Sequence, residues 1–104
     1  MKNLKLVYSK ESMDDLAEIV EYIKKDSLNA AKIFEHNLRK KIKLLKQFPE
    51  MGKVADDPRL QGIRILVIGN YLVLYEVESD QNVVYLHGFC HGARDYPNMF
   101  KKLK

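Results

Sequence analysis

The sequence predicts an α+β fold in which a helical hairpin packs on one face of a small, mostly antiparallel sheet. Two apolar stripes with helical spacing follow a short strand-like run near the N-terminus, and three runs rich in β-branched and aromatic residues follow the helices. The resulting order of elements is β-α-α-β-β-β. At 104 residues, of which 46% are hydrophobic, the chain is expected to form a single domain over 1–104.

The first half of the chain predicts a strand followed by two helices. Residues 4–8 are mostly apolar with partial alternation, which is typical of a strand. Ser9 can cap a first helix and Ser27 a second, because a serine side chain accepts a hydrogen bond from a backbone amide of the first turn. The connection between the helices is short, so we expect an antiparallel hairpin.

Each predicted helix has one apolar stripe that should face the core. The stripe of the first helix consists of Met13, Leu16, Ile19 or Val20, and Ile23. Its opposite face is mostly acidic and carries Asp14, Asp15, Glu18 and Glu21. The stripe of the second helix consists of Ala31, Phe34, Leu38, Ile42 and Leu45. Pro49 ends that helix because proline lacks a backbone donor, and residues 49–61 are expected to form a loop.

The second half of the chain predicts three strands joined by turns. Residues 62–68 and 71–78 form a hairpin with a tight turn at Gly69-Asn70, and a strand over 83–89 follows a turn at 79–82. Alternation along the middle strand places Tyr71, Val73, Tyr75 and Val77 on one side. The helices cover one face of the predicted sheet, and the other face is available to a partner.

The net charge of +4 is unevenly distributed along the chain. Residues 27–47 carry six cations against Glu35, and residues 81–104 carry four cations against Asp95. Such asymmetry suits a polyanion or an acidic peptide as the partner. A lysine-rich solvent face of a helix would give the same composition, so both interpretations stay open at this point.

Several classes of protein and site are not expected. No segment approaches the roughly 20 apolar residues of a membrane span, and the N-terminus lacks the apolar region of a signal peptide, so we expect a cytoplasmic protein with no membrane contact. Cys90 is the single cysteine, which excludes an internal disulfide. His87, Cys90 and His91 lie close in sequence, but no fourth ligand is evident, so no metal site is expected.

Three motifs carry a resemblance to a known family. They are Phe48-Pro49-Glu50-Met51-Gly52, the paired strands around 69–77, and the run 83–97, in which a strand leads directly into ionisable residues. In this order and spacing they resemble the RelE/ParE superfamily, the toxins of bacterial type II toxin–antitoxin pairs, over roughly 4–100. The resemblance implies a growth-inhibiting toxin of a plasmid-stabilisation type of system. It also implies a cognate antitoxin as partner and no cofactor.

The resemblance leaves two activities open. A ParE-like toxin would bind DNA gyrase, whereas a RelE-like toxin would cleave mRNA on the ribosome as an enzyme. Members that cut mRNA usually have additional arginines or lysines where this chain has Ile65-Leu66-Val67-Ile68 and Leu72. The run His91-Gly92-Ala93-Arg94-Asp95 is more similar to the ParE branch. We therefore favour gyrase inhibition, with ribosome-associated mRNA cleavage as the alternative.

Candidate functional residues follow from these two activities. Cleaving RNA without a metal needs a base, a cation and an acid held together. The candidates for that chemistry are Lys53, Arg64, His91, Arg94 and Tyr96, with His87 as a further histidine in the last strand. The candidates for binding a target are Arg64, His91, Arg94 and Asp95.

Arg94 is the strongest candidate because a guanidinium can grip a phosphate or a carboxylate in two places. Ordinary structural roles would also explain these residues. Arg94 could pair with a carboxylate of the first helix, Asp95 is a common turn residue, and His87 is a half-buried strand residue.

Overall fold

The computed structural model describes residues 3–92, which form two long helices and a five-stranded sheet. The elements are β1 (Lys5–Tyr8), α1 (Lys10–Lys24), α2 (Leu28–Lys43), β2 (Lys53–Val54), β3 (Ile63–Ile68), β4 (Tyr71–Glu78) and β5 (Val83–His91). The predicted α+β fold and the predicted order of elements are confirmed. The additional strand β2 lies inside the stretch predicted as a loop.

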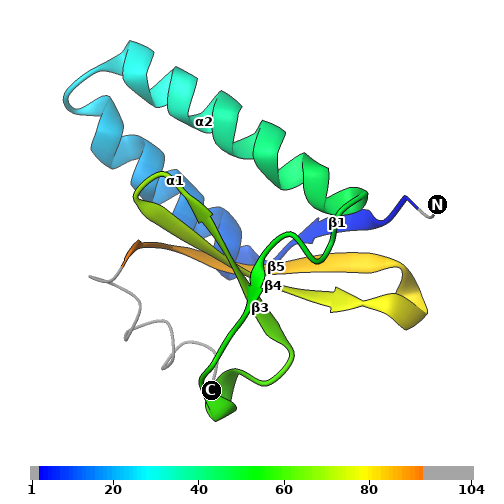
Figure 1. Ribbon diagram of the computed structural model, residues 1–104. Helices are drawn as coiled ribbons and strands as arrows, with labels where there is room; N and C mark the ends of the chain where they lie inside the picture. Colours follow the sequence, from blue (N-terminus) through cyan, green and yellow to red (C-terminus); the bar gives the residue numbers. More distant parts are fainter. Residues whose placement is uncertain (1–2, 93–104) are drawn as a thin grey trace.

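The sheet has the strand order β1-β5-β4-β3-β2. β1 and β5 are parallel, and the other three pairs are antiparallel. Figure 1 shows α1 and α2 together on one side of the strands, which we call the helix face of the sheet; the opposite side is the far face. The β3–β4 hairpin turns at Gly69, whose φ of +60° suits a residue without a side chain.

Both helices begin at the predicted serine caps. The Ser9 hydroxyl accepts a hydrogen bond of 3.0 Å from the Ser12 amide, and the Ser27 hydroxyl accepts one of 3.0 Å from the Ala30 amide. These bonds satisfy amides that have no partner within their own helix. None of the helices in residues 3–92 is long and apolar enough to cross a membrane.

The main core lies between the helices and the helix face of the sheet. The residues buried there include Leu16, Leu38, Ile42, Leu45, Val73, Tyr75, Val84, Leu86 and Phe89. Phe34 is only partly buried and packs against this cluster. A second, smaller cluster lies on the far face and consists of Leu60, Ile63, Leu74 and Cys90. The chain that follows β2 therefore covers part of the face that we expected to be open.

Two residues of α1 lie differently from the prediction. Met13 was predicted in the apolar stripe but is 60% exposed, because Ser12 takes the buried position and its hydroxyl donates a hydrogen bond of 2.8 Å to the Ser9 carbonyl. Asp15 was predicted on the solvent face but is only 7% exposed. Its carboxylate accepts a hydrogen bond of 3.2 Å from the Phe89 amide of β5.

The contact of Asp15 lies beyond the point where β1 stops pairing with β5, next to an irregularity in β5. β1 pairs with β5 only as far as Leu86, and the next part of the strand edge is met by α1 and its cap. The Ser9 hydroxyl donates to the His87 carbonyl at 3.2 Å. On the other side of β5, Leu74 pairs with Gly88 and Tyr75 pairs with Leu86, so His87 is the extra residue of a β-bulge.

We predict that Leu38→Ala lowers the free energy of unfolding by about 2–5 kcal/mol, because it removes a fully buried side chain from the main core. Ile33→Ala, on the exposed side of the same helix, should change it by less than about 0.5 kcal/mol. Urea denaturation of the two variants measures both values. Equal stabilities would show that α2 does not pack as described.

Candidate functional site

Tyr75 fixes the loop that carries the Phe-Pro-Glu-Met-Gly motif. Its side chain is fully buried, and its hydroxyl donates a hydrogen bond of 2.7 Å to the Pro49 carbonyl. The same oxygen accepts a hydrogen bond of 2.8 Å from the Gly52 amide. A Cβ on Gly52 would lie 2.7 Å from the tyrosine ring and hydroxyl, so only glycine fits there. Burial raises the pKa of the Tyr75 hydroxyl above its usual value.

Arg64, a predicted target-binding residue, holds the same loop. Arg64 lies on the same side of β3 as Leu66, which is part of the main core, and Ile68, which packs against it. The Arg64 guanidinium donates to the Gly52 carbonyl at 2.8 Å and to the Glu50 carbonyl at 3.4 Å. This candidate side chain therefore contributes to the support of a loop.

The two candidate histidines point to opposite faces of the sheet. His87 lies on the far face, where its Nε2 is 3.0 Å from Glu76 Oε1 and its ring meets the Tyr85 ring edge-on at 4.8 Å. His91 lies on the helix face, where its ring meets the Tyr71 ring edge-on at 5.2 Å. Tyr71 in turn packs against Phe34 of α2. The two imidazoles therefore cannot act as acid and base on one phosphate.

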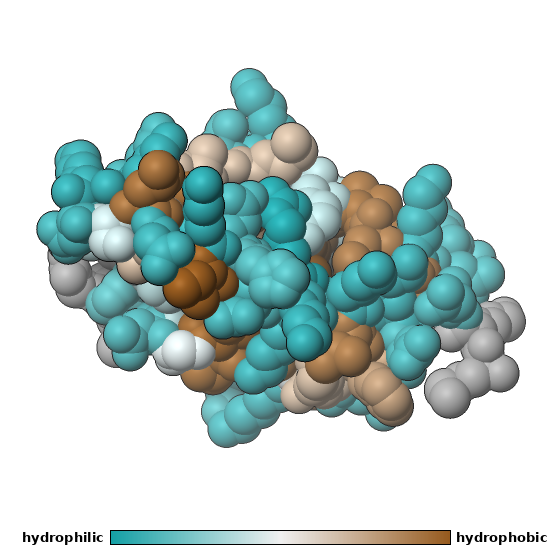
Figure 2. Space-filling model, turned by 90° about the horizontal axis from the view of Figure 1, so that it is seen from above, coloured by the Kyte–Doolittle hydropathy of each residue, from teal (hydrophilic) through white to brown (hydrophobic). Residues whose placement is uncertain are grey.

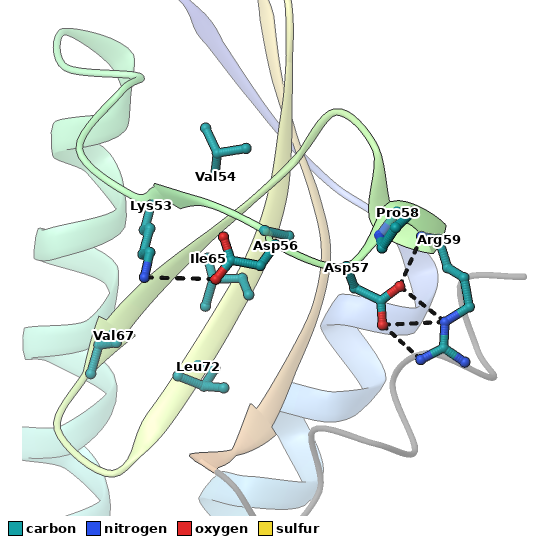
Figure 3. Close-up of a pocket in the computed structure, with 10 residues that line it drawn as sticks. Lys53, Val54, Asp56, Asp57, Pro58, Arg59, Ile65, Val67 and Leu72 are labelled. Carbon is teal, nitrogen blue, oxygen red and sulfur yellow. Dashed lines mark hydrogen bonds and ion pairs between the residues drawn. The ribbon is translucent and has the colours of Figure 1, made fainter.

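A pocket of about 760 Å³ lies on the far face between β2, the following loop and the β3–β4 hairpin. Figure 3 shows Ile65, Val67 and Leu72 among the side chains that line it. Charged residues at the pocket are paired: Lys53 Nζ lies 3.9 Å from Asp56, and Arg59 lies 2.7 Å from Asp57. Lys53, predicted as a catalytic candidate, is therefore at the rim of an apolar pocket beside a carboxylate.

Sequence reasoning missed this pocket and Arg59. The sequence signal at this place is the Asp-Asp-Pro-Arg run at 56–59, which indicates a short capped turn because an aspartate before a proline often caps one. Asp57 does so here, since its carboxylate accepts a hydrogen bond of 2.9 Å from the Arg59 amide at the start of the 3₁₀ turn Pro58–Leu60.

The remaining candidates, Arg94, Asp95 and Tyr96, lie outside the described residues. Within residues 3–92, no group of three or more histidine, cysteine or acidic side chains is arranged to hold a metal ion. The four candidates that the structure does describe thus lie apart. Arg64 supports the loop, Lys53 lies at the pocket rim, and His87 and His91 lie on opposite faces of the last strand.

Comparison with known proteins gives a family and a fold. The family model described as "ParE toxin of type II toxin-antitoxin system, parDE" matches residues 6–96. A comparison with curated protein sequences finds no match. Among solved structures, the chain is similar to the chromosomal ParDE toxin–antitoxin system from P. aeruginosa, with a TM-score of 0.66 and 15% identity over 86% of this chain and 97% of that chain.

Two further solved structures have the same fold. The toxin–antitoxin complex RelBE2 from Mycobacterium tuberculosis has a TM-score of 0.60 and 18% identity, covering 86% of this chain and 98% of that chain. The isolated RelE toxin from E. coli has a TM-score of 0.60 and 14% identity, covering 97% of this chain and 99% of that chain. The resemblance noted in the sequence is therefore confirmed.

We predict that Tyr75→Phe lowers the free energy of unfolding at pH 8 by about 1–3 kcal/mol, because the buried Gly52 amide and Pro49 carbonyl lose their partner. The variant should also lose less stability above about pH 10 than the wild type. A tyrosine whose pKa is raised by folding contributes stability that is complete below the unfolded pKa and is lost as the pH rises through the folded value.

Urea denaturation of the Tyr75→Phe variant at pH 8 and at alkaline pH measures both effects. Tyr22→Phe, at an exposed position of α1, is the matched control and should leave the stability at pH 8 unchanged. If the Tyr75 variant were as stable as the wild type at pH 8, the two hydrogen bonds would not support the loop.

Proposed function

Because the chain belongs to the ParE toxin family of type II toxin–antitoxin systems, we propose that it inhibits bacterial growth by binding DNA gyrase and not by cleaving RNA. A cognate antitoxin would keep it silent. Catalysis requires several groups at one reacting bond, whereas a binding inhibitor needs only a complementary surface. The arrangement of the candidate residues supports the second mode of action.

The observation that carries this proposal is the dispersal of the candidate acid, base and cation groups. His87 and His91 are on opposite faces of the sheet, and Arg64 donates to loop carbonyls. Lys53 lies beside Asp56 at the pocket rim. Among the candidate residues within 3–92, the two imidazoles and the two cations therefore do not converge on a point where a phosphate could be held and the neighbouring 2′-hydroxyl deprotonated.

Ribosome-associated mRNA cleavage remains the second candidate because of one specific contact. Glu76 orients the His87 imidazole at 3.0 Å on the far face, with Tyr85 beside it. A carboxylate that fixes a ring nitrogen is a common way to prepare a histidine for proton transfer. If the chain were a nuclease, His87 and Glu76 would be the acid–base pair to test first.

The antitoxin partner is supported by the charges of the helical hairpin. α1 exposes the carboxylates of Asp14, Glu18 and Glu21, whereas the exposed charged residues of α2 are four lysines and one arginine. Two of the similar solved structures are complexes of a toxin with its antitoxin. A peptide that folds on binding can match a surface that has both a negatively charged and a positively charged region. Arg94 and Asp95 remain our proposed target-binding residues.

Brief expression followed by pulse labelling tests the proposal. Thymidine incorporation should fall before methionine incorporation, and linearised DNA should accumulate, because gyrase trapped on DNA blocks replication. Purified gyrase should lose supercoiling activity when the protein is added. Early arrest of translation with cleaved messages would contradict the proposal and favour the nuclease.

We predict that His87→Gln and His91→Gln leave growth inhibition within an order of magnitude of the wild type. Glutamine keeps the hydrogen-bonding capacity but cannot transfer a proton at neutral pH, and general acid–base catalysis typically contributes about 10²–10⁴-fold. Colony counts after graded induction measure the effect. A large loss of toxicity in either folded variant, with antitoxin binding intact, would favour RNA cleavage.

A further inference from the structure

Three exposed hydrophobic residues lie at the end of α2 and in the loop that Tyr75 and Arg64 hold. Phe48 is 53% exposed, Leu44 is 44% exposed and Met51 is 37% exposed. Their backbones are joined directly, because the Phe48 amide donates to the Leu44 carbonyl at 2.8 Å and the Met51 amide donates to the Phe48 carbonyl at 3.1 Å. We call these three residues the loop patch.

Phe48 and Met51 lie outside the helices and strands, and side chains from the sheet hold their loop in place. Single exposed apolar side chains, such as Tyr22 and Ile33, are normal on a protein surface and need no explanation. Phe48 and Met51, in contrast, lie on a segment whose backbone is bonded to the buried hydroxyl of Tyr75 and to the guanidinium of Arg64, and the Leu44 carbonyl is bonded to the Phe48 amide. Four hydrogen bonds from these two side chains therefore hold the loop that carries Phe48 and Met51.

Such rigid support matters for association. Ordering a loop or a side chain on binding costs free energy, so a surface that is already fixed gains affinity without new contacts. Aromatic and other large apolar anchors at the centre of an interface supply most of its binding energy. Phe48 has both properties of such an anchor: a large aromatic side chain and a backbone that is already fixed.

The charges around the loop patch indicate the chemistry of its partner. Residues 40–52 contain four lysines and one acidic residue, Glu50. Lys41 donates to the Val67 carbonyl on β3. Lys40 and Lys43 are exposed and, within residues 3–92, form no ion pair. Figure 2 looks down on the α2 side of the molecule, where patches of hydrophobic residues lie among hydrophilic ones.

We propose that the loop patch docks into an apolar pocket with an acidic rim on the folded target protein of this toxin. Phe48 and Met51 enter the pocket, and Lys40 and Lys43 meet carboxylates at its rim. A preformed, small and fixed patch fits a preformed concave surface, whereas a wrapping peptide would instead cover a long stretch of the hairpin. This inference rests on the proposed function, since it assigns a surface to the binding of the target.

The first test is a double variant, Phe48→Ser with Met51→Ser, in the full chain. Both residues are exposed, so the melting temperature should stay close to that of the wild type. Binding to purified gyrase, measured by surface plasmon resonance, should weaken at least tenfold, as expected when an anchor residue is removed. Inhibition of supercoiling and of growth should weaken with it. The matched control Tyr22→Ser removes an exposed aromatic residue of α1 and should change none of these readouts.

The second test is Lys43→Glu, which keeps the loop patch and reverses one rim charge. The association rate with the same gyrase preparation should fall, and the difference from the wild type should shrink as salt rises from about 50 to 300 mM, because exposed charges are screened. Lys25→Glu, at the end of α1, is the control, because Lys25 is an exposed lysine that forms no ion pair within residues 3–92.

Two results would overturn the inference. One is a double variant as toxic as the wild type, whether or not it still binds the antitoxin. The other is a folded double variant that binds gyrase as tightly as the wild type. Failure of the proposed function would look different, because the wild-type chain would then leave gyrase active and arrest translation. In that case, a double variant that arrests growth as strongly as the wild type would also show that the loop patch does not bind the target.

Discussion

The buried hydroxyl of Tyr75 is the interaction on which the position of the chain between α2 and β2 depends. A phenol inside the main core must find partners for its polar atom, since an unpaired buried hydroxyl is costly. Tyr75 finds them in the Pro49 carbonyl and the Gly52 amide, 26 and 23 residues away in sequence. The chain that leaves α2 is thereby drawn against the sheet, and β2 begins directly after it.

These two hydrogen bonds explain several neighbouring features. Gly52 has no room for a side chain because the tyrosine ring occupies the space. Arg64, one strand away and paired directly with Tyr75, completes the support by bonding the Gly52 and Glu50 carbonyls. The Phe-Pro-Glu-Met-Gly motif is therefore a consequence of packing: its proline and glycine fit the turn, and its phenylalanine and methionine are left exposed.

Local signals predicted the fold well, whereas contacts between distant segments could not be predicted. The serine caps, the β3–β4 turn and the stripe of Leu38 and Ile42 depend on residues close in sequence, and each is confirmed. The burial of Asp15 depends on where β1 stops pairing with β5. Its partner, the Phe89 amide, is 74 residues away in sequence. Periodicity alone therefore placed Asp15 in solvent. Periodicity also placed Met13 in the core. In the structure Ser12 takes that buried position, because its hydroxyl is satisfied by the Ser9 carbonyl.

The candidate site was harder to predict for the same reason. Chemically suitable side chains were found from their types, but the bulge at His87 decides which face each of the following residues points to. An uninterrupted strand would put His87 and His91 on the same face, because they are four residues apart. The extra residue breaks that alternation and separates them. A single β-bulge thus separates the two histidines that the sequence offers as an acid–base pair. The local sign of the bulge is Gly88 in the interior of the strand, which does not by itself tell which residue is the extra one.

The distribution of charge is the last constraint on function. Exposed ion pairs such as Lys53 with Asp56 add little to stability, but they neutralise cations that an anionic substrate would need. Arg59 is engaged by Asp57 in the same way, and Arg64 is engaged by carbonyls. In the described part of the chain, the exposed lysines without an ion pair include Lys40 and Lys43, near the loop patch. Charge is thus available beside a fixed apolar surface, an arrangement that suits recognition of a protein more than clamping of a phosphate.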